Sequence, residues 1–230
     1  MARPKAPTFD RQRTAILETA AQLFADHGFL GASMADLAQA CGVSKALLYH
    51  YYRDKEQLLF DTADSYMDRL LEIVGDVRAR RLPPEDQLRA LIARFMQEYQ
   101  HSRAKHMVLV QDVKFLGDAQ RVQVIAKQRQ VVEAFAQAIA AVKPRFRRKA
   151  LRVPLAMILF GMINWTFTWL RADGALTYAN MADIVTEIFL HGAVDSAPAG
   201  RADAPLRRDL RNRPPPLTKR GSAKRRGGVV

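Results

Sequence analysis

The chain has 230 residues, 49% of them hydrophobic, and a formal net charge of +13. This length suits one small domain followed by a larger one, with enough apolar residues for a sizeable core. The single cysteine, Cys41, excludes a disulfide framework, and the first residues lack the apolar segment of a signal peptide. We therefore expect a cytoplasmic protein.

The positive charge is concentrated at the two ends of the chain. Residues 195–230 hold ten Lys or Arg against three Asp, and residues 10–194 keep a surplus of only +4. The acidic and basic residues of 10–55 balance outright. Net charge alone therefore does not predict a nucleic-acid partner, and any such function depends on where individual cations point.

Residues 33–56 predict two short helices around a tight turn. Ser33 is placed to cap the first helix. Its apolar residues fall at i, i+3, i+4 and i+7 and are Met34, Leu37, Ala38 and Cys41. Gly42 follows as a helix stop, because glycine tolerates the left-handed conformation. Ser44 then caps a second helix from Lys45 to about Tyr52.

The second helix has two different faces. Leu47, Leu48 and Tyr51 share the side that is expected to pack inward. The opposite side carries a cation, a small residue and two hydrogen-bonding rings, namely Lys45, Ala46, Tyr49 and His50. Such a surface suits a helix lying in the DNA major groove, so the segment is a candidate helix-turn-helix.

The flanking segments complete this pattern. A helix is predicted over 11–29, and another begins at Lys55, directly after the candidate recognition helix. The run from Ile16 to Leu59 contains A-x-x-L-F-x-x-x-G-F, S-M-x-x-L-A-x-x-x-G-V-S-K and L-Y-x-Y-Y-x-x-K-E-x-L-L. It resembles the DNA-binding domain of the tetracycline repressor (TetR) family. Ser33 stands where threonine is usual, and Tyr52 where phenylalanine is.

This resemblance implies a dimeric bacterial repressor that binds a double-stranded operator on the nucleoid and responds to a small hydrophobic effector. It implies that Tyr49, His50 and Lys55 contact phosphates, while Lys45 and Ala46 lie near base edges. Ser33, Ser44 and Tyr52 lie near the ends of the two helices and complete the predicted DNA-binding set. We expect no catalytic residues, metal or cofactor, since the five histidines are scattered and no phosphate loop or nucleophile elbow occurs.

The remainder reads as all-α. Helices are predicted over 55–80, 85–102, 104–116, 118–142, 145–170 and 178–191, with a turn at 172–175. By resemblance, the last two form the dimer interface. The uncharged stretch Val153–Leu170 also reaches the lower length limit of a membrane span. We favour the dimer interface, because a helix that packs inward and also meets a partner is apolar on all sides.

Residues Asn164–Trp169, followed by Asp173 and Gly174, resemble a TetR subgroup that senses acyl-CoA thioesters. We predict an effector pocket lined by aromatic residues and one orienting amide, namely Phe95, Tyr99, Phe160, Asn164 and Trp165. The alternative is that the tryptophans pack in the dimer core. A drug-like effector is the second hypothesis, and an effector-independent architectural DNA-binding protein is the third.

The predicted organisation has four parts. They are a flexible basic arm (1–9), a three-helix DNA-binding domain (10–55), a helical ligand-binding and dimerisation domain (56–194) and a disordered basic tail (195–230). The tail holds five of the eleven prolines. It is expected either to solubilise the protein or to add salt-sensitive affinity for DNA.

Overall fold

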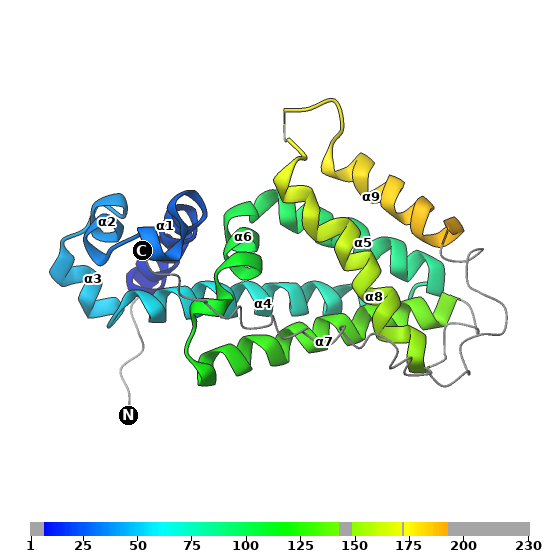
Figure 1. Cartoon of the computed structure of the whole chain (residues 1–230), viewed down its shortest axis with the longest axis horizontal. Coiled ribbons are helices and arrows are strands. Elements are labelled where there is room, and N and C mark those ends of the chain that lie inside the picture. Colours follow the sequence, from blue (N-terminus) through cyan, green and yellow to red (C-terminus); the bar gives the residue numbers. More distant parts are fainter. Residues whose placement is uncertain (1–6, 143–148, 172, 193–230) are drawn as a thin grey trace, which may run out of the picture. The chain divides into compact units, whose positions relative to one another are not determined.

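The structure, a computed structural model, describes residues 7–142, 149–171 and 173–192. Every regular element in these ranges is helical, which confirms the predicted all-α class (Figure 1). The predicted tail at 195–230 and residues 1–6 of the predicted arm lie outside the described residues. Residues 7–9 of that arm belong to the first helix, α1 (Pro7–Gly31).

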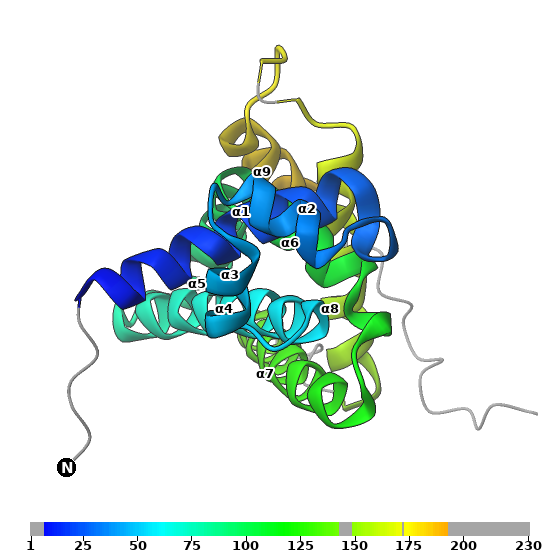
Figure 2. The same ribbon diagram turned by 90° about the vertical axis from the view of Figure 1, so that its left-hand side faces the viewer.

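Helix α1, α2 (Met34–Ala40) and α3 (Lys45–Tyr51) form the predicted three-helix unit, which Figure 2 views from its outer side. Their apolar faces share one core. Its fully buried side chains include Ile16, Ala20, Phe24, Leu37 and Leu48. Gly28 interrupts α1 with a φ of +72°, a conformation that glycine adopts without steric cost.

The predicted caps of the helix-turn-helix are confirmed. The Ser33 hydroxyl oxygen accepts a hydrogen bond from the Asp36 amide, and the Asp36 carboxylate accepts from the Ser33 amide, a reciprocal capping box. Gly42 adopts a φ of +63°, which reverses the chain between α2 and α3. The Ser44 hydroxyl then accepts from the Leu47 amide at 3.1 Å and starts α3.

Helix α4 (Lys55–Ala79) connects this unit to the following helices. The Asp54 carboxylate caps it by accepting from the Gln57 amide at 2.8 Å. Helix α4 packs against α1 at one end and against helices of the second group along the rest of its length (Figure 1). That second group comprises α5 (Pro84–His101), α6 (Arg103–Gln111), α7 (Asp118–Val142), α8 (Lys149–Asn164) and α9 (Tyr178–Glu187).

The centre of the second group is aromatic. The rings of Phe95 on α5 and Phe135 on α7 meet at a centroid distance of 4.8 Å, and Phe160 on α8 lies 4.8 Å from Phe135. All three side chains are buried. These ring contacts hold α5, α7 and α8 together, although the three helices are far apart in the sequence.

Three predicted helices differ from the observed ones near their ends. The helix predicted over 104–116 is split into α6 and a short 3₁₀ turn, η1 (Val113–Phe115). The helix predicted over 145–170 begins in the described part at Lys149 and changes to 3₁₀ geometry in η3 (Trp165–Thr168). Helix α9 continues as a π-helical turn, η4 (Ile188–Gly192). Tightened or widened turns at helix ends are common and leave no trace in apolar spacing.

One stretch, Ala150–Thr168, is long and apolar enough by length and composition alone to cross a membrane. It overlaps the segment singled out from the sequence. A single such helix is weak support for a membrane protein, because interface and core helices have the same composition. Its inner side chains, such as Ala156, Leu159 and Ile163, are fully buried against the rest of the protein.

Candidate DNA-binding surface and ligand cavity

The outer side of α3 presents the side chains that the sequence predicts. Lys45, Ala46, Tyr49 and His50 are all exposed, whereas Leu48 on the inner side is fully buried. The surface therefore offers one cation, a small residue that permits close approach, and two rings with hydrogen-bonding groups. These are the groups that bind phosphates and base edges in a major groove.

Fewer side chains of α3 are buried than the sequence predicts. Leu47 is 39% exposed and lies at the edge of the core, which corrects the expectation that it packs inward with Leu48. Tyr51 is half-buried and stacks on Phe9 of α1 with ring centroids 4.6 Å apart. Helix α3 is short and packs into the core mainly through Leu48, so Leu47 and Tyr51 lie at the edge of the core.

Ser33 and Ser44 are exposed, but both side chains already serve as helix caps. The Ser33 hydroxyl also donates to Asp36 Oδ2 at 2.6 Å, and these hydrogen bonds hold the pKa of the Asp36 carboxyl below its usual range. Each serine therefore fixes the start of a helix beside the candidate DNA surface. Their backbone position, as well as any direct contact, would orient α3.

Tyr52 and Lys55 are placed differently from the other predicted DNA contacts. Tyr52 is 1% exposed, and its hydroxyl lies beside the ion pair of Arg13 and Asp61, whose atoms are 2.6 Å apart. Burial raises the pKa of Tyr52 to about 12, so the phenol stays protonated. Tyr52 is therefore a core residue, and we leave it out of the candidate surface.

The Lys55 ammonium donates to the backbone carbonyls of Phe29 and Ala32, both at 2.8 Å, and lies 4.5 Å above the Phe29 ring. These contacts fasten the start of α4 to the corner between α1 and α2. Lys55 therefore has a positioning role that sequence reasoning missed. An ammonium has three protons, so one remains for a phosphate.

Cys41 is half-buried and packs against the core of the three-helix unit. Burial raises the pKa of its thiol, which disfavours the reactive thiolate. The cysteine therefore fills a small packed position at the end of α2. A redox role would require the opposite shift of the pKa.

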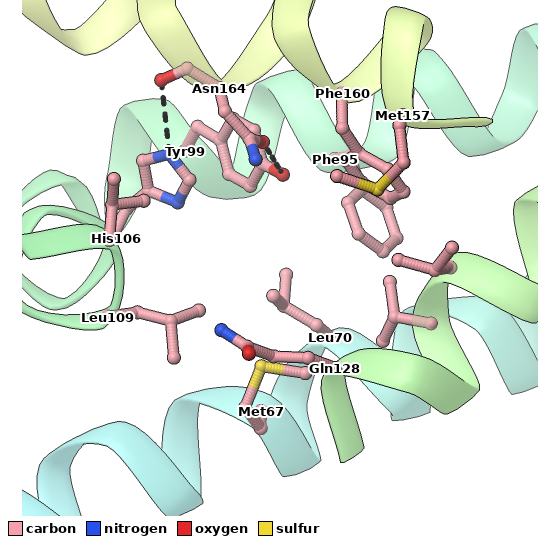
Figure 3. A pocket seen from close by; sticks show the side chains of 13 residues that line it. Met67, Leu70, Phe95, Tyr99, His106, Leu109, Gln128, Met157, Phe160 and Asn164 are labelled. Atoms are coloured by element: carbon pink, nitrogen blue, oxygen red, sulfur yellow. Dashed lines mark hydrogen bonds between the residues drawn. The ribbon is translucent and has the colours of Figure 1, made fainter. Parts of the chain in front are cut away.

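A cavity of about 210 Å³ lies between helices α4, α5, α6, α7 and α8 (Figure 3). Four of the five predicted ligand residues line it, namely Phe95, Tyr99, Phe160 and Asn164. The other lining residues are Met67, Leu70, His106, Leu109, Val110, Gln128, Val131, Val132 and Met157. Val110 and Met157 are about half exposed, so the cavity reaches the protein surface between α6 and α8.

The polar end of the cavity is built on Tyr99, His106 and Asn164. The Tyr99 hydroxyl donates to Asn164 Oδ1 at 2.8 Å, and the His106 ring stacks on Tyr99 with centroids 3.9 Å apart. Burial raises the pKa of Tyr99 and lowers the pKa of His106 to about 4, so both side chains are neutral near pH 7. The cavity therefore offers neutral hydrogen-bonding groups within apolar walls.

The lining of the cavity contains no Asp, Glu, Lys or Arg. A buried charge without a partner is costly, so the inserted part of a ligand must be uncharged. Sequence reasoning missed His106 and Gln128, because each is a single polar residue whose place in the cavity depends on how α6 and α7 pack against the other helices. The described ranges also contain no cluster of three or more His, Cys, Asp or Glu that could hold a metal ion.

Trp165 does not belong to this cavity, so its assignment to the pocket is wrong. Its side chain is 63% exposed and is not among the lining residues. The chain changes to 3₁₀ geometry in η3, directly after Asn164. Trp169 is 51% exposed as well. Phe167 between them is buried and contacts the His106 ring, so the aromatic residues of this segment divide between the core and an outer surface.

An apolar surface covers α8, η3, α9 and η4. Its large exposed side chains are Val153, Met157, Ile158, Trp165, Trp169, Leu176, Ile184 and Ile188. Several large exposed apolar side chains on neighbouring elements are typical of an interface. We call it the α8–α9 face. It lies on the two helices that were predicted to form the dimer contact.

Helix α6 contacts both the cavity and the three-helix unit. His106 and Leu109 line the cavity, while the neighbouring Lys105 pairs with Glu18 of α1. At the other end, the Phe115 ring of η1 stacks on Phe29 of α1 with centroids 5.6 Å apart. A shift of α6 would therefore also displace α1, which α6 and η1 contact through these residues (Figure 1).

Glu56 joins the same region to α4. Its carboxylate accepts a hydrogen bond from the Gly117 amide at 2.8 Å, between η1 and α7. The start of α4 is thus tied to α1 through Lys55 and to the end of η1 through Glu56. The helix that follows the recognition helix is held from two sides.

A helix-turn-helix with an exposed recognition helix, followed by a helical domain with a cavity and an apolar outer face, defines a DNA-binding transcriptional regulator. The family model of bacterial regulatory proteins of the tetR family matches residues 16–62, and the tetracyclin repressor-like C-terminal domain matches residues 81–193. The chain belongs to the TetR family.

Three relatives illustrate the likeness. A TetR-family transcriptional regulator from Bordetella parapertussis 12822 is 34% identical, with a TM-score of 0.76 over 81% of this chain and 98% of that one. AibR, solved with isovaleryl coenzyme A and operator DNA, is 29% identical, with a TM-score of 0.69 over 77% and 97%. The repressor KstR2 of Rhodococcus jostii is 25% identical over 184 residues, which are 79% of this chain and 90% of that protein.

Proposed function

We propose that this protein is a dimeric repressor that binds a palindromic operator and releases it when an acyl-CoA thioester enters the cavity. In this proposal residues 10–55 bind DNA, and residues 56–194 bind the effector and form the dimer. The protein acts in the cytoplasm, on the nucleoid. The observation that carries the effector assignment is the uncharged cavity, which has a polar end built on Tyr99, His106 and Asn164.

The outer side of α3 is proposed to read the operator. Lys45 and Ala46 lie at the start of the helix and would meet base edges, while Tyr49 and His50 would contact phosphates. Ser33 and Ser44 would set the orientation of the helix through their caps. Lys55 would add a phosphate contact from a position that two backbone carbonyls already fix.

The dimer is proposed to form through the α8–α9 face. Burial of apolar surface is the main stabilising contribution in obligate interfaces, and this face carries large side chains such as Ile158, Trp165 and Ile188. A two-fold dimer would place its recognition helices in successive major grooves, about 34–36 Å apart. The operator is then expected to be a palindrome.

The size and neutrality of the cavity support a thioester as effector. A cavity of about 210 Å³ holds one ring or a short branched chain, whereas drug-sized ligands occupy roughly 300–1,000 Å³. The acyl group would therefore lie inside, and the coenzyme would extend past Val110 on the α6 side of the mouth. A free carboxylic acid is ionised near pH 7 and would bring a negative charge into the uncharged cavity, whereas the thioester of the same acid is neutral.

The relatives support the same choice of effector class. AibR was solved with isovaleryl coenzyme A, and KstR2 of Mycobacterium tuberculosis is described as a ketosteroid transcriptional regulator. Of these two, the isovaleryl group is a short branched chain of the size that this cavity holds. Phenylacetyl-CoA is the first candidate, because Phe95 and Phe160 form an aromatic wall beside Asn164.

Helix α6 is proposed to couple the two functions. An acyl group between His106 and Met67 would displace α6, and through Lys105 and Glu18 the movement would reach α1. The effector can release DNA only by binding the DNA-free conformation more tightly than the DNA-bound one. Coupling of this kind is typically worth about 1–3 kcal/mol.

The operator is the first experimental target. Selection of bound sequences from random DNA, followed by footprinting, should give one short palindrome that the dimer protects at moderate salt. An architectural protein would show no preferred site. Short, long and aromatic acyl-CoAs are then added to the complex. A panel that leaves the operator bound would reject the thioester proposal and direct attention to drug-like aromatic compounds, while the DNA-binding assignment would stand.

A further inference from the structure

The cavity contains a buried hydrogen-bond acceptor without a partner. His106 is 2% exposed, and its Nδ1 atom makes no hydrogen bond with any described residue. The other ring nitrogen, Nε2, lies 3.4 Å from the backbone carbonyl oxygen of Asn164. A carbonyl oxygen only accepts, so the proton is on Nε2, and Nδ1 carries a free lone pair.

The surroundings of His106 hold the ring in this orientation. Tyr99 stacks on one face at 3.9 Å, and Tyr66 and Phe167 meet the ring edge-on at 6.2 and 5.6 Å. Figure 3 shows Nδ1 on the side of the ring that faces the cavity, toward Leu109 and Gln128. Few buried polar atoms of native proteins lack a partner, and each such atom calls for an explanation.

The rest of the polar end is already paired or offers donors. Asn164 Oδ1 accepts from Tyr99, which leaves the amide protons of Asn164 free to donate into the cavity. Gln128 lies across the cavity from His106, with its amide turned toward the interior (Figure 3). His106 Nδ1 is therefore a fixed acceptor beside two amides that can donate.

We infer that the effector carries a hydroxyl group on its acyl part, which donates a hydrogen bond to His106 Nδ1. The inference rests on the proposed effector role of the cavity and narrows it to hydroxylated acyl groups. A cationic donor is excluded, because the lining contains no carboxylate. The amides of the pantetheine arm are less suitable donors, since a cavity of about 210 Å³ holds the acyl group and leaves the arm at the mouth.

The neutral ring supports this role. Burial lowers the pKa of His106 to about 4, so Nδ1 remains an acceptor throughout the physiological range. A ligand without a donor would bury Nδ1 unpaired, whereas a hydroxyl group would satisfy it. The site should therefore discriminate between two ligands that differ by one hydroxyl group.

The test is a comparison of matched ligands by titration calorimetry on the full chain. Phenylacetyl-CoA is compared with its three ring-hydroxylated derivatives, which carry the hydroxyl group at the ortho, meta or para position. At least one derivative is expected to bind about tenfold more tightly than phenylacetyl-CoA. His106→Phe should abolish this preference. His106→Asn should retain part of it, because the asparagine side-chain oxygen can occupy the position of Nδ1. Val122→Ala, at an exposed position of α7 outside the cavity lining, should leave the preference unchanged, and circular dichroism checks that each variant folds.

A second pair of probes separates this inference from the proposed function. Phenol and toluene fit the cavity without coenzyme A, and the preference for phenol should fall about tenfold between wild type and His106→Phe. If this fall occurs while no acyl-CoA binds, the hydroxyl inference stands and the thioester proposal fails. If acyl-CoAs bind but neither pair of probes depends on His106, the inference is overturned and the thioester proposal stands.

Discussion

The recognition surface and the cavity hold their polar groups in opposite ways. On α3, Lys45 and Tyr49 project into solvent from a helix that is fixed by one buried leucine and a serine cap. In the cavity, Tyr99 and His106 are almost fully buried and held by rings from neighbouring helices. One site is organised within a few residues of sequence, and the other is assembled across five helices.

This difference determines how each site discriminates between partners. Exposed cations gain affinity by releasing counterions from DNA, so their contribution falls with salt. Buried neutral groups discriminate through the cost of leaving a hydrogen bond unmade, which salt hardly changes. Each of the following variants should affect one region and leave the other intact.

The largest expected effect concerns the single leucine that docks α3. Leu48→Ala removes a fully buried side chain and should lower the free energy of unfolding by about 2–5 kcal/mol in a urea titration. Leu47→Ala, at the neighbouring half-exposed position, should change it by no more than about 0.5 kcal/mol. Equal losses in the two variants would contradict the observed orientation of α3.

Acid should act on the cavity through His106. Its pKa is about 4 in the folded protein and 6.5 in the free side chain, so the unfolded chain binds the extra proton first. The contribution of His106 to the free energy of unfolding should therefore be constant above pH 6.5 and fall by up to about 3 kcal/mol between pH 6.5 and 4. The groups around the ring are Tyr66, Tyr99, Phe167 and the Asn164 carbonyl, none of which titrates in this window.

The measurement is a set of denaturant titrations at several pH values, with His106→Phe as reference. The free energy of unfolding of the wild type minus that of the variant should fall by up to about 3 kcal/mol between pH 6.5 and pH 4. Two parallel pH profiles would show that His106 is not buried in its neutral form.

Substitutions on the recognition surface should change DNA binding alone. Lys45→Ala should cost about 1–3 kcal/mol at the selected operator and relax its base preference. Tyr49→Ala should weaken binding to all sequences equally, because it removes a phosphate contact. Gel-shift titrations measure both effects, and calorimetry should show that ligand affinity is unchanged. An unaltered base preference in Lys45→Ala would remove that residue from the base-reading set.

The smallest effect is expected at the hydrogen bond between Tyr99 and Asn164. Tyr99→Phe removes the donor from a 2.8 Å bond and should lower the free energy of unfolding by about 1 kcal/mol. Tyr49→Phe, which removes an exposed hydroxyl group, is the matched control and should stay within about 0.5 kcal/mol of wild type. A loss in the control as large as that in Tyr99→Phe would show that burial does not distinguish the two hydroxyls.

Local sequence signals account for what could be predicted. The caps at Ser33 and Ser44 and the stop at Gly42 depend on residues within one turn of each other, and all three were predictable. The sequence predicted less well how deeply Leu47, Tyr52 and Lys55 are buried, because this depends on how α3 and the start of α4 pack against α1. Lys55 is held by carbonyls more than twenty residues away.

The cavity shows the same limit more strongly. Phe95, Tyr99, Phe160 and Asn164 were predictable because they are aromatic or polar residues on clearly apolar helices. His106 and Gln128 gave no such signal, since their role appears only when α6 and α7 close the cavity. Trp165 was misassigned because a change from α to 3₁₀ geometry after Asn164 turns it outward.

The most direct test of the account is reciprocity between the two sites. Operator affinity is measured with and without saturating acyl-CoA, and acyl-CoA affinity with and without operator, on the same dimer. Both affinities should fall by the same factor, about 5–150-fold for a coupling free energy of about 1–3 kcal/mol. A ligand that binds the cavity with full affinity and leaves the operator affinity unchanged would contradict coupling between the two sites.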